Sequence, residues 1–197
     1  MDSGLGASPQ DFRLLWSGFC RGDHHCQEKL LTAFYQEMRG IARRILSGDS
    51  ASVHLQPTEL VNETILRLLK VNRLDLRDSN HFLALAARMM RQVLLDEVRR
   101  YRAQKRQSPA ILTTWIESGP AESAIDIEAL DRSLTRLAEV SAERARIVEL
   151  RFFAGMTVED IAGVMEVSER SVKRHWQAAR AWLLRDLTRT ETLGHRA

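Results

Sequence analysis

The sequence has few of the residues that stabilise small secreted proteins or carry out covalent chemistry. Its 197 residues include only two cysteines, too few for a disulfide scaffold, and only 6% of the residues are aromatic. It has no apolar run long enough to span a membrane and no recognisable signal peptide, so we expect a reduced, cytoplasmic protein without a membrane partner. It also lacks a Gly-rich phosphate loop, a nucleophile elbow and a convincing carboxylate pair. We therefore expect no enzyme activity and no cofactor.

The two cysteines belong to a compact cluster made of Cys20, His24, His25 and Cys26. Four such side chains could bind zinc, but their spacing matches no zinc-binding pattern, and Cys20 is expected on the buried side of a helix. We predict no metal site.

Leucine, alanine and arginine dominate the chain, and neither strand patterns nor internal repeats are present, so we predict an all-α fold. Breakers and acidic residues predict a flexible acidic linker at 107–130, with a helix beginning by about Ile125. The linker joins two small helical domains, residues 9–106 and 131–187. Gly155 is expected to end a helix, and the tail from Thr188 is expected to be frayed and without function.

The last third of the chain contains two short amphipathic patterns joined by a tight turn, which is typical of a helix-turn-helix. Thr157 and Asp160 have the spacing of a capping pair, and Ser168 is placed to cap the second helix. That helix has an apolar stripe and an opposite face made of Arg170, Lys173, Arg174 and Gln177. A charged helix face is often only solvated. When the helix follows a short capped helix and a tight turn, its charged face instead indicates that the helix enters a DNA major groove.

A second concentration of positive charge lies on a long helix expected from about Asn80 to Arg106. From residue 88 to residue 106 the chain has seven basic and two acidic residues, a net charge of +5 (7 − 2). One sector of this helix carries Arg88, Arg91, Gln92, Arg99, Arg102 and Arg106. Crowded arginines repel one another, which favours a phosphate-binding surface over a merely solvated face.

With these segments in this order, the chain resembles the extracytoplasmic-function (ECF) sigma factors of bacterial RNA polymerase from about Pro9 to Leu187. The resemblance rests on the Gln56–Leu69 segment, which reads Gln-Pro-Thr-Glu-Leu-Val-Asn-Glu-Thr-Ile-Leu-Arg-Leu-Leu, and on the segments His81–Arg91, Asp96–Arg106 and Leu150–Leu184. It implies a sigma factor that binds core polymerase and directs promoter recognition and initiation. The implied partners are core polymerase and promoter DNA, duplex at −35 and melted at −10. An anti-sigma factor or a Ser/Thr kinase is a candidate regulator.

The resemblance also implies roles for particular residues. The first domain is similar to sigma region 2, in which contacts to core polymerase fall on Thr58, Glu59, Asn62 and Glu63. Contacts to the −10 element fall on Asn80, His81, Phe82, Arg88, Arg91, Gln92, Arg99, Arg102 and Arg106. The second domain is similar to region 4, in which −35 contacts fall on Arg170, Ser171, Lys173, Arg174 and Gln177. For Phe82, an ordinary core position is an open alternative to stacking on a base.

The chain departs from the family at the start of the polymerase-docking helix. Many relatives have Asp-Ala-Glu-Asp where this chain has Gln56, Pro57, Thr58 and Glu59, so two expected carboxylates are missing. Phosphorylation of Thr58 would add about −1.5 to −2 charge close to a helix N-terminus, where negative charge is favoured. A plain helix cap at Thr58 is the open alternative. Thr64 is a second phosphorylation candidate.

The alternative function is that of an autonomous helix-turn-helix regulator whose N-terminal domain is a sensor or dimerisation unit. The arginine-rich helix argues against this, because a sensor domain needs no second nucleic-acid surface.

Overall fold

The structure, a computed structural model, describes residues 9–47, 55–71, 74–105 and 127–194. Within these ranges it contains eight helices and no strand, which confirms the all-α prediction. In chain order they are α1 (Pro9–Cys20), α2 (His24–Ser47), α3 (Pro57–Leu68), α4 (Ser79–Lys105), α6 (Ile127–Val140), α7 (Ala142–Phe152), α8 (Val158–Met165) and α9 (Glu169–Gly194). None of these described helices is both long enough and apolar enough to cross a membrane. Most of the expected linker, residues 107–126, lies outside the described residues, and residues 127–130 already belong to α6.

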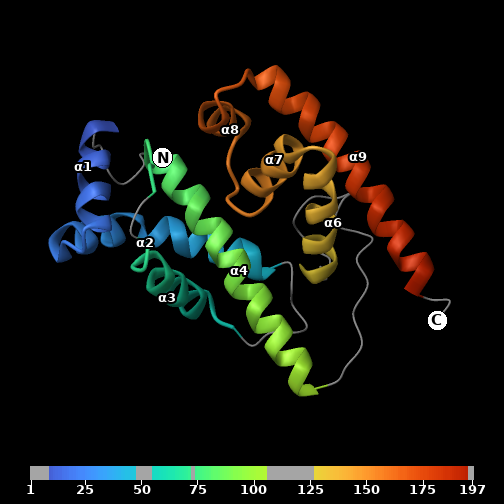
Figure 1. The fold of residues 1–197 in the computed structure, drawn as a ribbon, viewed down its shortest axis with the longest axis horizontal. Helices are drawn as coiled ribbons and strands as arrows, with labels where there is room; N and C mark the ends of the chain where they lie inside the picture. Colours follow the sequence, from blue (N-terminus) through green and yellow to red (C-terminus); the bar gives the residue numbers. More distant parts are fainter. Residues whose placement is uncertain (1–8, 48–54, 72–73, 106–126, 195–197) are drawn as a thin grey trace.

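Helices α1 to α4 pack against one another and form the N-terminal bundle (Figure 1). Its core is aromatic, because Phe82 at the start of α4 is fully buried among Phe12, Trp16 and Phe34. The ring centroids lie 6.4, 5.9 and 5.0 Å from that of Phe82, respectively. The indole Nε1 of Trp16 donates a 2.6 Å hydrogen bond to the carbonyl of Leu74, which fixes the segment before α4 against α1.

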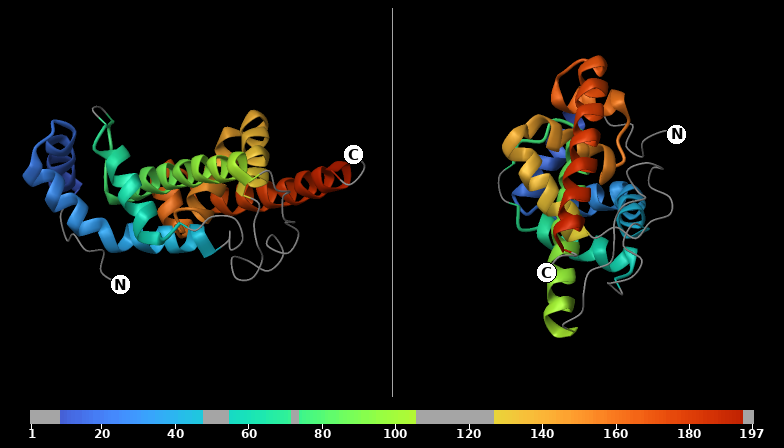
Figure 2. Two further views of the ribbon diagram at one scale, coloured as in Figure 1. Left: turned by 90° about the horizontal axis from the view of Figure 1, so that it is seen from below. Right: turned by 90° about the vertical axis from the view of Figure 1, so that its right-hand side faces the viewer.

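Helices α6 to α9 form the C-terminal bundle, in which α7 lies between α6 and α8, and α9 packs against all three (Figure 1). The two bundles lie side by side, and the long helix α4 runs next to α6, α7 and α8 (Figures 1 and 2). One hydrophobic cluster continues from the N-terminal bundle into α6, α7 and α9. A smaller cluster joins Ala84 of α4 to Ile147 and Leu150 of α7.

A second connection between the bundles joins α2 to the turn that follows α7. The guanidinium of Arg44 donates a 3.0 Å hydrogen bond to the carbonyl of Ala154. Gly155 follows at φ +68°, and a Cβ there would overlap the Arg44 guanidinium. The backbone angle therefore favours glycine, and a larger residue would also displace the Arg44 guanidinium from this position. The predicted end of the helix is confirmed to within a few residues, since α7 ends at Phe152.

Helix α9 is longer than the sequence predicts, because it continues to Gly194 instead of fraying from Thr188. The turn of α9 just before the extension is held by side-chain packing and by an ion pair with α6. Leu187 is 5% exposed, and Asp186 accepts hydrogen bonds from the Arg136 guanidinium. Burial alone would raise the pKa of Asp186, but hydrogen bonds from Arg136 and Ser133 outweigh it and lower the pKa. The expectation of a frayed tail was therefore wrong for residues 188–194.

The Asp186–Arg136 pair predicts how the stability of the C-terminal bundle depends on pH. At neutral pH, Asp186→Asn should lower the free energy of unfolding by roughly 1–2 kcal/mol, between the values for surface and buried pairs. Because the folded-state pKa is lowered, this stabilisation is present above the ordinary value of 3.8 and is lost as pH falls through the folded-state pKa. The free energies of unfolding of wild type and variant, measured by urea denaturation, should therefore become equal in acid. The exposed Glu139→Gln variant is the control, and a gap that persists in acid would contradict the prediction.

Candidate nucleic-acid interface

The predicted helix-turn-helix is confirmed as α8 and α9, and local hydrogen bonds cap the start of each helix. The hydroxyl of Thr157 accepts the Asp160 N–H at 3.1 Å, and the Asp160 carboxylate accepts the Thr157 N–H at 3.0 Å. Helix α8 ends where Glu166 adopts φ +56°, a left-handed conformation that non-glycine residues rarely take. Ser168 then accepts the Ser171 N–H at 3.2 Å and begins α9. The Thr157 and Asp160 bonds thus hold the start of α8, and the turn to α9 is held by the Ser168 bond and by the Val167 N–H, which donates to the Ala162 carbonyl at 3.1 Å.

Helix α9 presents the predicted basic face to solvent. Val172 and Ala179 are fully buried and Leu183 is 3% exposed, which confirms most of the apolar stripe. On the opposite side the predicted contact residues are exposed, except for the half-buried Ser171: Arg170, Lys173, Arg174 and Gln177. Lys173 forms a 3.0 Å ion pair with Glu169 one turn earlier, an exposed pair that a phosphate could replace. The face is thus available to a ligand as the protein stands.

The arginine-rich face of α4 is only partly free. Arg88 and Gln92 are exposed, and the side chain of Arg99 is 54% exposed. The side chain of Arg102 and the whole of Arg106 lie outside the described residues. Leu95, which interrupts the polar sector in sequence, is 1% exposed and packs inward.

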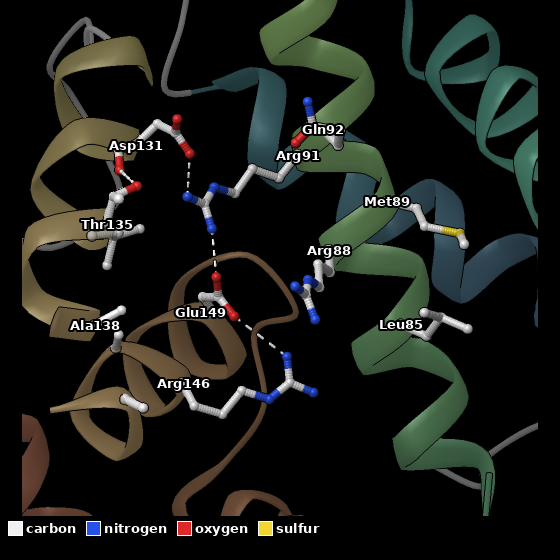
Figure 3. Close-up of a pocket in the computed structure, with 13 residues that line it drawn as sticks. Leu85, Arg88, Met89, Arg91, Gln92, Asp131, Thr135, Ala138, Arg146 and Glu149 are labelled. Atoms are coloured by element: carbon white, nitrogen blue, oxygen red, sulfur yellow. Dashed lines mark hydrogen bonds and ion pairs between the residues drawn. The ribbon is translucent and has the colours of Figure 1, made fainter. Parts of the chain in front are cut away.

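Arg91 differs from these residues because the C-terminal bundle covers it. Its guanidinium forms ion pairs with Asp131 of α6 and Glu149 of α7, and only 11% of the side chain is exposed. It also lies over the ring of Phe153, 5.2 Å from the centroid. Figure 3 shows Arg91 reaching from α4 toward both carboxylates. No spacing rule connects residues on three separate helices, so sequence reasoning missed this pairing.

The segment that leads into α4 is built around Asp78. Its carboxylate accepts the His81 N–H and lies beside the His81 Nδ1, both at 2.9 Å. Burial would raise the pKa of Asp78, but the bonds from His81 outweigh it and lower the pKa. Asn80 donates a 3.4 Å hydrogen bond to Asp160 of α8. Phe82 is fully buried, so in this conformation no base can stack on it, and the core alternative fits the structure.

The four predicted polymerase contacts lie in the first two turns of α3, and Glu59, Asn62 and Glu63 are exposed. The N-cap is Gln56, whose N–H donates a 2.7 Å hydrogen bond to Glu59. The suggestion that Thr58 is the cap was therefore wrong, because Pro57 takes the first helical position, for which its ring is suited. Thr64 is fully buried and donates to the Leu60 carbonyl, which makes its hydroxyl inaccessible to a kinase.

The cysteine and histidine cluster does not converge on a common point. Cys20 and Cys26 are free thiols, and His24 and His25 are exposed. Among the described residues, no group of three or more His, Cys, Asp or Glu side chains is arranged to hold a metal ion. Burial raises the pKa of the Cys20 thiol, against the effect of a hydrogen bond with the backbone of Leu74.

Comparison with known proteins adds an independent finding. A family model described as "ECF sigma factor" matches residues 10–189, a range that contains nearly all of α1 and most of α9. No curated protein and no solved structure matches the chain.

Proposed function

Because the chain belongs to the ECF sigma factor family, we propose that its two helical bundles divide promoter recognition between them. Family membership gives the chain the role of an RNA polymerase sigma factor, which binds DNA in transcription initiation and belongs to no enzyme family. In our proposal the C-terminal bundle binds the −35 element as duplex, and the N-terminal bundle binds core polymerase and the melted −10 element. The observation that carries the proposal is the exposed basic face of α9, the second helix of a helix-turn-helix whose first helix, α8, is capped.

At the −35 element, α9 lies in the major groove with Arg170, Lys173, Arg174 and Gln177 toward the bases and phosphates. Arginine or lysine pairs with guanine and glutamine with adenine, and each good pairing contributes ~1–3 kcal/mol of discrimination. Ser171, half-buried beside Ser168, suits a backbone phosphate better than a base edge. The exposure of the four longer side chains supports this assignment.

At the −10 element, the start of α4 contacts the separated strand. Asn80 and His81 supply polar groups for base edges, and Arg88, Arg91, Gln92 and Arg99 hold phosphates. Arg102 and Arg106 extend the same sector in sequence. Phe82 acts from the core, where it fixes the direction in which α4 leaves the bundle.

Core polymerase docks on the exposed face of α3. Glu59, Asn62 and Leu66 recur at helical spacing on one side, and the side chain of Leu66 is 55% exposed.

We propose that phosphorylation of Thr58 regulates this docking. Thr58 lies half-buried in the first turn of α3, where added negative charge is favoured by the helix dipole. We expect Thr58→Ala to abolish activation that depends on a Ser/Thr kinase while leaving the helicity of α3 intact. Transcription in cells, compared for wild type and Thr58→Ala, tests this, and equal transcription would exclude the switch.

Run-off transcription on a pool of genomic fragments tests the proposed function. Core polymerase is used with and without the protein, and new transcripts are mapped. Transcripts that need both components and start downstream of a shared −35/−10 pair support the proposal. Tight duplex binding without polymerase and no new transcripts would instead support an autonomous regulator.

A further inference from the structure

A cleft of about 820 Å³ lies between α4, α6 and α7. Sites for small molecules have volumes of roughly 300–1,000 Å³, so the cleft is large enough for one. Part of its wall is aliphatic and is drawn from all three helices: Leu85, Met89, Leu134, Ala138 and Ala145. Among the described residues, no aromatic side chain lines this cleft. Because flat rings bind best against other rings, the wall favours an aliphatic group.

The walls of the cleft are held in place by the packing around them. Leu134 and Ala145 belong to the hydrophobic cluster that continues from the N-terminal bundle into α6 and α7. Arg91 of α4 forms ion pairs with Asp131 of α6 and Glu149 of α7, all three of which line the cleft. Small-molecule sites are usually formed before the ligand arrives, and a cleft with fixed walls meets this condition.

The polar part of the wall carries more positive than negative charge. Its charged residues are three arginines, Arg88, Arg91 and Arg146, and two carboxylates, Asp131 and Glu149, a net charge of +1 (3 − 2). Both carboxylates bind Arg91, and Arg146 has a single 3.4 Å contact with Glu149. Arg88 forms no ion pair with another described residue. Since a guanidinium keeps its charge at any physiological pH, this surplus attracts an anion.

The two arginines with the fewest partners enter the cleft from different helices. Figure 3 shows Arg88 projecting from α4 and Arg146 from α7 into the space between them. Both also line a narrow space next to the cleft, so their side chains lie close together. A third donor, the Nε of Arg91, is buried without a hydrogen-bond partner among the described residues. Guanidinium groups that converge in this way suit the oxygens of a phosphate or carboxylate.

We propose that this cleft binds a small aliphatic anion with a phosphate head. The phosphate is held between Arg88 and Arg146, and the aliphatic body lies against Leu85, Met89 and Leu134. Phosphate suits the site better than carboxylate because its three oxygens and charge of about −1.5 to −2 let two guanidinium groups bind it together.

The existence of this site does not rest on the proposed function, but one consequence does. Arg88 is also assigned to phosphates of the −10 element, so the ligand and the separated strand compete for this side chain. The experiments below use neither polymerase nor promoter DNA, so their outcome is independent of the run-off experiment.

Isothermal titration calorimetry of the full chain with decyl phosphate, below the concentration at which it forms micelles, tests the proposal. One molecule should bind per chain. It should bind at least roughly 10-fold more tightly than inorganic phosphate, which has no apolar body, and than decanol, which has no charge. Equal affinity for decyl phosphate and either of these compounds overturns the proposal. Binding to phosphatidic acid vesicles without binding to free decyl phosphate would make the anion a membrane surface and overturns it as well.

Arg146→Gln tests the position of the site. It should weaken the binding of decyl phosphate by about 10-fold or more, because it removes one of the two charged donors. The matched control is Arg132→Gln, which removes the same charge from an exposed position of α6 outside the cleft and should bind like wild type. Ala138→Glu, which introduces a carboxylate into the cleft at an exposed position, should abolish binding. Circular dichroism verifies that each variant keeps its helices, and equal affinity of Arg146→Gln and Arg132→Gln overturns the proposal.

NMR of protein with ¹³C-labelled methionine methyl groups locates the bound molecule. Met89 lines the cleft, whereas Met165 at the end of α8 does not. The variant Met89→Leu identifies the Met89 signal. Decyl phosphate should shift the Met89 signal and leave that of Met165 in place. Binding that shifts the Met165 signal but not that of Met89 would place the molecule at the helix-turn-helix and overturns the proposal.

Discussion

Replacing both Arg170 and Arg174 by alanine is expected to lower run-off transcription from this factor's promoters by roughly 10- to 100-fold. Both side chains are exposed on α9, opposite the buried Val172 and Ala179. A bidentate arginine–guanine contact contributes ~1–3 kcal/mol, and about 1.4 kcal/mol corresponds to a tenfold change. Because neither arginine packs into the core, the thermal unfolding midpoint should change little.

The matched control is the pair Arg132→Ala and Arg185→Ala, which removes the same charge from exposed positions on α6 and the later part of α9. This pair should retain most of the activity. An equal loss in the control would mean that the C-terminal bundle attracts DNA only through its overall charge. Single variants then separate two roles: loss of a base contact relaxes specificity at one promoter position, whereas loss of a phosphate contact weakens all promoters and lowers the salt dependence by about one unit.

Sequence reasoning was most successful where short-range rules decide the structure. The capping pair Thr157 and Asp160, and the cap Ser168, depend on neighbours within a few residues. The buried side of α9 follows from helical periodicity alone. Glu166, in contrast, ends α8 in a left-handed conformation that glycine or asparagine would have indicated and glutamate does not.

The errors arose where tertiary contacts or competing local bonds decide. Helix α9 continues past Thr188 because Asp186 is bound by Arg136 of α6 and Leu187 is buried, which no local pattern reveals. Thr58 is not the cap of α3, because a bond from the Gln56 N–H to Glu59 serves that end of the helix. The pairing of Arg91 with the other bundle depends on two helices folding back on α4, so the sequence indicated a uniform basic face where the structure has a partly masked one.

Phe82→Ala is expected to destabilise the N-terminal bundle by roughly 3–5 kcal/mol, the usual cost of removing a fully buried phenylalanine. The ring is completely buried, and three aromatic rings, those of Phe12, Trp16 and Phe34, would line the cavity that remains. Hydrogen exchange should therefore accelerate in α1, α2 and α4. Leu14→Ala in α1 is the control, because Leu14 is 71% exposed and its truncation should change stability by less than ~0.5 kcal/mol.

Phe82→Leu separates a core role from a base-stacking role. Leucine retains most of the buried apolar volume, so the variant should lose much less stability than Phe82→Ala. It has no ring on which a base could stack, so a stacking role requires a loss of ~1–3 kcal/mol in binding of the −10 strand. Since Phe82 is fully buried where α4 begins, we expect Phe82→Leu to transcribe nearly as well as wild type at low temperature. A stable Phe82→Leu protein that fails to melt the promoter would show instead that the ring leaves the core to bind DNA.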